Sequence, residues 1–215
     1  MVRDLKYPKF MVHSVYIFVF ILNITVNLDH GAMPAALLDI SNDAEFSDQQ
    51  MGTLGSLVFF GLFIGTLNAS FLLYRVKHKT IIIGTLLLNG VSLYLFTVKS
   101  NYYCMCISRF IAGFSQIFIT IYVPLYVDAF SSQKSKIHLL SIAMLCPTIG
   151  VVFGYGLTSY IINRGGVWET HYKAYWWQSF RIQTWLNWLT AVLAFLIPGK
   201  YLNVDDAIKE KREYL

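Results

Sequence analysis

Six long apolar stretches follow one another along this 215-residue chain and leave little sequence between them. A helix that crosses the hydrocarbon core of a bilayer needs about 20 mainly apolar residues. We therefore expect an all-α, polytopic membrane protein, with a bundle of six transmembrane helices over residues 1–203. Residues 204–215 are charged and are expected to form a cytoplasmic-side tail or the start of a linker to a second half. The predicted spans are Met11–Ala36, Gly52–Leu73, Thr80–Val98, Tyr102–Tyr126, Ile137–Ile162 and Trp176–Ile197.

The composition agrees with a protein embedded in membrane lipid and excludes several other classes. Only 13% of the residues are charged, whereas soluble domains carry about 25%. The basic residues are scattered between apolar runs, so nucleic acid is not an expected partner. The 3 cysteines are too few for a disulfide framework. We find no catalytic constellation and no metal-binding spacing, and expect neither an enzyme nor a bound metal or cofactor.

The basic residues predict the orientation, because Lys and Arg are retained on the cytoplasmic side of a membrane. With the N-terminus inside, only Lys99, Arg164 and Lys173 fall in outer loops. The inner side holds twelve basic residues: Arg3, Lys6, Lys9, Arg75, Lys77, Lys79, Lys134, Lys136, Lys200, Lys209, Lys211 and Arg212. Both termini are therefore predicted on the cytoplasmic or an equivalent side; the sequence carries no organelle address.

Two outer loops have recognisable features. The first is predicted to hold an acidic group formed by Asp39, Asp43, Glu45 and Asp48. The last runs from the fifth to the sixth span, and its sequence Arg164-Gly165-Gly166 predicts a turn.

Small residues recur at four-residue spacing in two spans. Gly61, Gly65 and Ala69 form one such row, and Gly150 and Gly154 belong to another in the fifth span. Helices in lipid associate through small residues that let their backbones approach. These rows predict close helix contacts.

The first span carries polar residues deep inside it. Asn23, Asn27 and His30 fall on one stripe of a helix, and Asp29 points to a different side. Polar groups in a bilayer face a cavity or a partner. Either the stripe lines a pore while Asp29 contacts a neighbouring helix, or the reverse.

The fourth span carries a matching polar stripe. It includes Arg109, Gln116 and Thr120. An intramembrane arginine needs a partner, and we predict that Asp29 and Arg109 lie close together across the bundle. The pair would either fix helix register as a neutralised ion pair or act through a protonatable carboxylate. His30 either joins a proton relay, because it titrates near neutrality, or is a packed hydrogen-bonding residue.

The motifs, in their order and spacing, resemble one six-helix half, the N-terminal one, of a major facilitator superfamily transporter, and within it the spinster-like branch. The resemblance covers about Phe10 to Leu202. The segments that carry it are Leu28–Leu37, Phe46–Gly52, Leu54–Leu57, Arg75–Lys79, Ser108–Gly113, Tyr126–Phe130 and Trp177–Gln183. The family needs about twelve helices in two halves with the substrate site between them, and this chain contains six predicted helices.

One family motif is altered here. The family's basic turn between helices two and three has an aspartate where this chain has Tyr74, whereas Arg75 is kept and Lys79 stands in the final basic pair. The resemblance implies an inner gate built from Arg75 and Lys79, with Asp128 as a substitute acidic partner for Arg75.

The resemblance implies transport of a small organic or amphiphilic, lysolipid-like solute by alternating access, coupled to protons, by a half-transporter or fragment. Asp29 would be the coupling carboxylate and Arg109 its charge partner, while Asn23, Asn27, Gln116 and Thr120 would line the cavity. The partner would be a second six-helix half, a second copy of the chain or other membrane subunits. The alternative is a non-transporting, structural membrane subunit of a larger complex.

Overall fold

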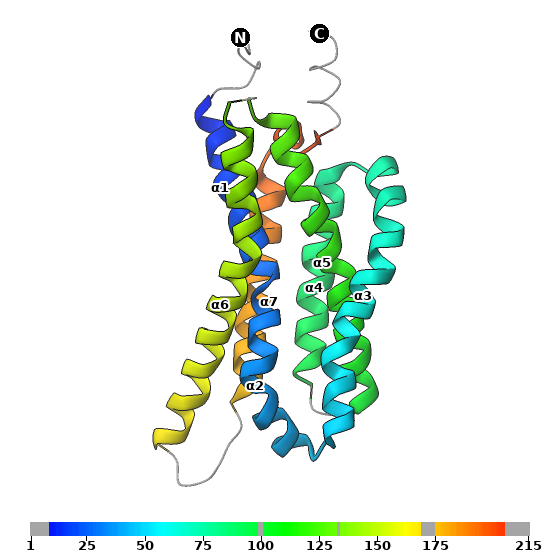
Figure 1. Cartoon of the computed structure of the whole chain (residues 1–215), viewed down its shortest axis with the longest axis vertical. Helices are drawn as coiled ribbons and strands as arrows, with labels where there is room; N and C mark the ends of the chain where they lie inside the picture. Colours follow the sequence, from blue (N-terminus) through cyan, green and yellow to red (C-terminus); the bar gives the residue numbers. More distant parts are fainter. Residues whose placement is uncertain (1–8, 99–100, 133, 169–174, 205–215) are drawn as a thin grey trace.

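The computed structural model describes residues 9–98, 101–132, 134–168 and 175–204. Nearly all of these residues are helical and none forms a strand. The helices run up and down along one long axis (Figure 1), which confirms the expected all-α architecture. They are α1 (Lys9–Val26), α2 (Leu28–Ala44), α3 (Asp48–Arg75), α4 (His78–Phe96), α5 (Tyr102–Phe130), α6 (Lys136–Trp168), α7 (Trp176–Leu196) and the short 3₁₀ helix η1 (Gly199–Tyr201).

The helices have the lengths of a multi-pass membrane protein. In the described part of the chain, five helical segments are long and apolar enough to cross a membrane, and α1 and α2 together form the first. The sixth predicted span corresponds to α7, which is not among those five. Ser179, Gln183 and Asn187 make α7 more polar, and all three are 0% exposed. The polar side of α7 therefore faces protein rather than lipid.

The first predicted span is broken at Asn27. The Asn27 N–H donates to the Ile24 carbonyl (3.1 Å), three residues back instead of four. Its side-chain Nδ2 donates to the Asn23 carbonyl (2.7 Å). Asparagine side chains compete with helical hydrogen bonds in this way, so α1 ends at Val26 and α2 starts anew at Leu28.

Two helices continue past their predicted ends. α2 runs to Ala44, so the prediction that Asp39 and Asp43 lie in a loop is wrong. α6 runs to Trp168, so the turn predicted at Arg164-Gly165-Gly166 is also wrong. Hydropathy falls where polar residues begin, but a helix that continues keeps its backbone groups hydrogen-bonded beyond that point.

The turn between α2 and α3 contains a strained residue. Glu45 has φ 53°, the left-handed region, at the C-terminal end of α2. The next helix begins with a capping box, in which Ser47 and Gln50 exchange side chain to backbone hydrogen bonds. The left-handed position at a helix end favours glycine.

Replacing Glu45 with glycine is therefore expected to raise the free energy of unfolding by about 0.5–1 kcal/mol. Thermal unfolding of the chain in detergent measures the change. Glu45→Gln removes the charge and keeps the Cβ atom, so it should leave the stability unchanged. If Glu45→Gln instead raised the free energy of unfolding, the charge of Glu45 and not its backbone conformation would be the cause.

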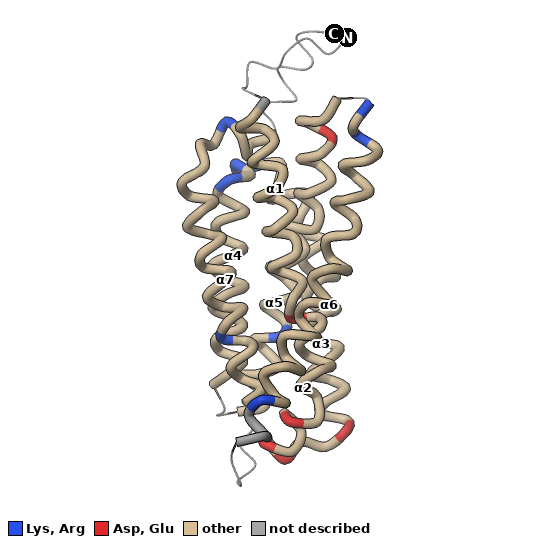
Figure 2. Tube along the Cα trace, turned by 90° about the vertical axis from the view of Figure 1, so that its left-hand side faces the viewer, with Lys and Arg blue, Asp and Glu red and all other residues tan. Residues whose placement is uncertain are grey.

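The bundle has a basic and an acidic end. α1 starts and η1 ends at the same end (Figure 1), where the turns from α3 to α4 and from α5 to α6 also lie. Most of the coloured Lys and Arg positions are found there, whereas the acidic positions gather chiefly around the α2–α3 turn at the opposite end (Figure 2). We call these the basic end and the acidic end.

Glycines bring helix backbones into direct contact in two places. Between α2 and α6, a Cβ atom on Gly31 would overlap the Val151 carbonyl oxygen, and one on Gly154 would overlap that of Leu28. Between α3 and α5, Gly61 and Gly113 have similar contacts with backbone oxygens of the opposite helix. The predicted close contacts are thus confirmed for Gly61, Gly65, Gly150 and Gly154.

Two apolar clusters fill the interior towards the ends of the bundle. The basic-end cluster includes Leu86, Ile119 and Ala191. The acidic-end cluster includes Phe96, Met105 and Phe180. Each cluster takes residues from α4, α5 and α7, so the segments between them lie at a common level, and these segments carry buried polar residues.

Candidate functional site

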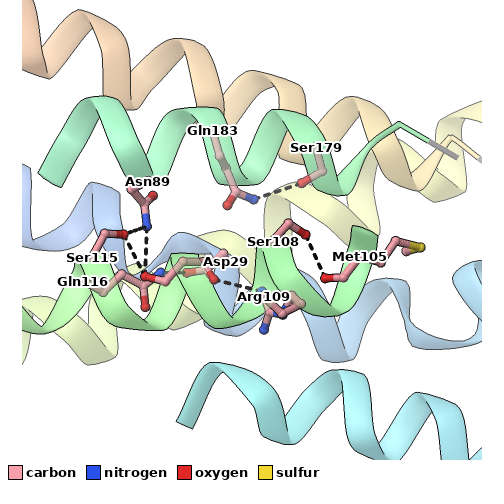
Figure 3. Close-up of polar contacts among 10 residues, drawn as sticks. Asp29, Asn89, Met105, Ser108, Arg109, Ser115, Gln116, Ser179 and Gln183 are labelled. Carbon is pink, nitrogen blue, oxygen red and sulfur yellow. Dashed lines mark hydrogen bonds and ion pairs between the residues drawn. The ribbon is translucent and has the colours of Figure 1, made fainter. Parts of the chain in front are cut away.

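A buried ion pair lies at this level of the bundle. Arg109 Nη1 of α5 donates to Asp29 Oδ2 of α2 at 3.0 Å. Gln116 Nε2, also of α5, donates to Asp29 Oδ1 at 2.7 Å. The residues are only 1–2% exposed, and Figure 3 shows both α5 side chains reaching towards Asp29. The predicted closeness of Asp29 and Arg109 is confirmed.

The local structure favours charge at both positions. The break at Asn27 places Asp29 in the first turn of α2, where the helix dipole stabilises a negative charge. The Arg109 guanidinium carbon lies 5.7 Å from the ring centroid of Phe96, which offers a cation–π contact. Buried charges in a membrane must be paired, and Asp29 and Arg109 are ion-pair partners of each other.

The site keeps unused hydrogen-bonding capacity. Within the described residues, Arg109 Nε and Gln116 Oε1 are buried and have no hydrogen-bond partner. The site therefore keeps one unpaired donor and one unpaired acceptor beside the ion pair.

Asn23 and His30, two of the other predicted cavity residues, contact different helices. Asn23 Nδ2 donates to the Ala143 carbonyl of α6 (3.2 Å). His30 is half-buried, and its ring centroid lies 6.1 Å from that of Phe59 on α3. Asp29 contacts α5, as one of the two alternatives for the first span has it. That the stripe of Asn23, Asn27 and His30 lines a pore stays a prediction.

Thr120 lies outside the hydrogen bonds around Asp29. It is exposed on α5, and its hydroxyl donates to the Gln116 carbonyl (3.2 Å). Gln116 and Thr120 therefore differ, since only Gln116 contacts the carboxylate. Two roles remain predictions. One is that His30 relays protons, and the other is that a substrate path is lined by Asn23, Asn27, Gln116 and Thr120.

The residues of the predicted inner gate lie near the basic end. The Arg75 guanidinium stacks over the Phe71 ring, 4.3 Å from its centroid. Asp128 forms an ion pair with Lys136 at the start of α6. The pairing of Asp128 with Arg75 stays a prediction, as does the gating role of Arg75, Lys79 and Asp128.

Lys79 has a structural contact that the sequence did not indicate. Its Nζ donates to the carbonyls of Phe195 and Ile197, both at 2.7 Å, where α7 ends. A lysine at the C-terminal end of a helix satisfies unpaired carbonyls and complements the dipole. Lys79 therefore ties the start of α4 to the end of α7.

Lys79→Met is expected to lower the free energy of unfolding by about 1–2 kcal/mol, because two carbonyls lose a charged donor. The shift of the thermal midpoint in detergent measures this loss. Lys77, two residues earlier, is exposed, so Lys77→Met is the matched control and should shift the midpoint little. Equal shifts would contradict the capping role.

The buried polar residues of α4 and α7 were missed by sequence reasoning. Asn89, Gln183 and Asn187 are 0–1% exposed. A signal was present on α7, where Ser179, Gln183 and Asn187 recur every four residues on one helix face.

The chain belongs to the Major Facilitator Superfamily, whose sequence profile matches residues 15–213. This confirms the expected family, which consists of transporters. Curated relatives include "Probable polyol transporter 3" from Arabidopsis thaliana, 27% identical over 142 residues that make up 63% of this chain and 27% of that protein. The galactose-proton symporter of Escherichia coli strain K12 is 24% identical over 143 residues, 66% of this chain and 30% of that one. The chain thus spans less than a third of these relatives.

Solved structures show the same fold. A bacterial homologue of the human lysosomal transporter Spinster, inward-facing and unoccupied, superposes with a TM-score of 0.75 at 16% identity and covers 88% of this chain and 43% of its own. The proton:xylose symporter XylE bound to 6-bromo-6-deoxy-D-glucose has a TM-score of 0.75 at 13% identity, with 97% and 50% covered. The expected likeness to the spinster branch holds for the fold, and a sugar symporter matches equally well.

Proposed function

We propose that this chain is one six-helix half of a proton-coupled carrier for a small organic solute, and that Asp29 carries the coupling. The observation that supports this most is the Asp29 carboxylate, held by Arg109 and Gln116 at 3.0 and 2.7 Å in the bundle interior. Ionisable residues inside a membrane are rare and mark substrate or proton pathways. A proton on Asp29 would release Arg109, and a solute with hydroxyl groups would offer it other acceptors.

The sequence relatives favour a polyhydroxylated solute over a lysolipid-like one. The curated relatives are described as a polyol transporter and a galactose-proton symporter. Alternating access would require a second six-helix unit across the substrate site. That unit would be a second copy of the chain, a second half or another membrane subunit, and the basic end would face the cytoplasm.

The test is solute-driven proton movement into proteoliposomes that enclose a pH-sensitive dye. Galactose, sorbitol and lysophosphatidylcholine are offered separately, and proton uptake with either of the first two is expected. Asp29→Asn keeps the size of the side chain and is expected to reduce the uptake about 100-fold, the range for loss of a proton-transferring group. Asp48→Asn, at an exposed position outside the bundle interior, should leave it unchanged.

Two outcomes would count against the proposal. Undiminished proton uptake in Asp29→Asn would remove Asp29 from the coupling step. The alternative of a structural membrane subunit would be supported by two results together. The mass of the detergent-solubilised protein would show a stable complex with unrelated subunits, and no solute would drive flux. Proton uptake with lysophosphatidylcholine alone would show that the solute is an amphiphile and not a polyhydroxylated compound.

A further inference from the structure

Between the two apolar clusters, six buried side chains of the described residues each leave one polar atom without a protein partner. They are Asn89 and Ser92 of α4, Arg109 and Gln116 of α5, and Gln183 and Asn187 of α7, which we call the polar layer. All six are 0–2% exposed. The unpaired atoms of these six side chains are four amide oxygens and two groups that can donate, Arg109 Nε and Ser92 Oγ.

The polar layer lies at one level of the bundle. On α4, its residues fall between Leu86 of the basic-end cluster and Phe96 of the acidic-end cluster. On α7 they fall between Ala191 and Phe180, and on α5 between Ile119 and Met105. On each of the three helices, the polar layer therefore has the basic-end cluster on one side along the helix and the acidic-end cluster on the other. The unpaired atoms lie between these two apolar clusters.

The protein contacts of the layer use the amide nitrogens and leave the oxygens. Asn89 Nδ2 donates to Ser115 Oγ of α5 (3.2 Å). Gln183 Nε2 donates to Ser179 Oγ (3.3 Å), and Asn187 Nδ2 to the Gln183 carbonyl (3.0 Å). Figure 3 shows the side chains of Asn89 and Gln183 both pointing from their helices towards α5. The oxygens therefore share an interior region with the residues around Asp29.

Water matches the hydrogen-bonding pattern of these atoms. Native proteins pair roughly 90% or more of their buried polar groups, often through ordered water. Four acceptors and two donors match a molecule that both donates and accepts. A cation would use the oxygens, but it would be repelled by Arg109 and would leave Arg109 Nε unpaired.

We propose that an ordered water cluster occupies the polar layer between α4, α5 and α7, adjoining the Asp29–Arg109 pair. The cluster hydrates Arg109 and Gln116 from inside the half-bundle. Arg109 can then move away from Asp29 without leaving its charge unsolvated. If the proposed proton coupling holds, the cluster also brings a proton-carrying molecule next to the pair.

The test uses hydroxyl radicals generated from water by a short X-ray pulse, followed by mass spectrometry of the full chain in detergent. Radicals formed inside a protein label the side chains next to the internal water. Phe96 and Phe180 border the polar layer, and Phe118 lies in a separate apolar cluster. All three are at most 2% exposed, so they differ in neighbourhood and not in access from outside. We expect Phe96 and Phe180 to be labelled at least about threefold faster than Phe118.

A variant links the labelling to the layer. Asn187→Leu removes one unpaired oxygen and fills its volume with an apolar side chain, so it should slow the labelling of Phe96 and Phe180. Thr190→Val, one turn further along α7, removes a hydroxyl that donates only to carbonyls of its own helix, and it should leave the labelling unchanged.

The wild-type measurement decides the proposal even if a variant fails to fold. Labelling of Phe96 and Phe180 no faster than that of Phe118 would show a dry layer and overturn it. A rise of the melting temperature with Na⁺ and not with choline would assign the oxygens to a cation and also overturn it. Neither result depends on whether the chain carries a solute.

Discussion

Arg109→Leu is expected to lower the free energy of unfolding of the chain by about 3–5 kcal/mol, the usual effect of removing one partner of a buried ion pair. Asp29 is 1% exposed and would keep only the Gln116 amide, at 2.7 Å, as a donor. An uncompensated carboxylate in this interior has to be protonated or hydrated, or the helices have to separate. The midpoint of unfolding in mixed detergent micelles measures the loss.

The double variant Asp29→Asn with Arg109→Leu separates charge from packing. It removes both charges, so it should regain most of the stability that Arg109→Leu loses. With the Asp29→Asn single variant measured as well, the change in the double variant minus the sum of the two single changes gives the coupling energy of the pair, expected at about 2 kcal/mol or more. If the double variant is no more stable than Arg109→Leu, the guanidinium contributes through its packing against Phe96.

Arg181 supplies a matched control for the arginine. It is half-buried on α7, donates from Nε to Thr97 Oγ1 at 3.4 Å and stacks on Trp177. It has neighbours like those of Arg109 but no carboxylate partner among the interactions of the described residues. Arg181→Leu should cost about 1 kcal/mol or less. A loss as large as that of Arg109→Leu would contradict the special role of the ion pair.

The ion pair could be predicted because intramembrane charges are few. Asp29 and Arg109 lie in apolar segments with few other charges. Pairing lowers the free-energy cost of burying both charges in the membrane. The helix contacts at Gly61 and Gly154 could be predicted as well, because small residues at four-residue spacing in a membrane helix are typical of close helix packing.

The remaining features depend on contacts that no local pattern shows. The break at Asn27 arises because its side chain competes for the Asn23 carbonyl, and many asparagines in helices do not compete in this way. Lys79 reaches carbonyls at the far end of the chain, at Phe195 and Ile197. Asn89 lies within an apolar span, and only the packing of α4 against α5 shows where its amide points.

The glycine contacts have a consequence for the site itself. Gly154 of α6 meets the backbone of Leu28, the residue before Asp29 and the first of α2. The position of the carboxylate therefore depends on how closely α6 approaches the start of α2. Gly154 thus helps to position the Asp29–Arg109 ion pair, although α6 contributes no atom to the pair.

Gly154→Leu is accordingly expected to lower the free energy of unfolding by about 3 kcal/mol or to prevent folding, which is the upper range for overpacking. A Cβ atom at residue 154 would overlap the Leu28 carbonyl oxygen and lie 2.9 Å from its Cα, and backbone atoms cannot move aside as a flexible side chain does. Expression yield and the unfolding midpoint in detergent measure the effect.

Gly156 lies on the same helix two residues later, is exposed, and has no atom within 4 Å of the position where its Cβ would lie. Gly156→Leu gains the same helix propensity, about 1 kcal/mol, so it should leave the chain as stable as before or slightly more so. If both variants lose stability equally, α6 needs its glycines for bending and not for contact with α2. If only Gly154→Leu does, the small residue is required where the two backbones meet, and the same contact holds Asp29 in reach of Arg109.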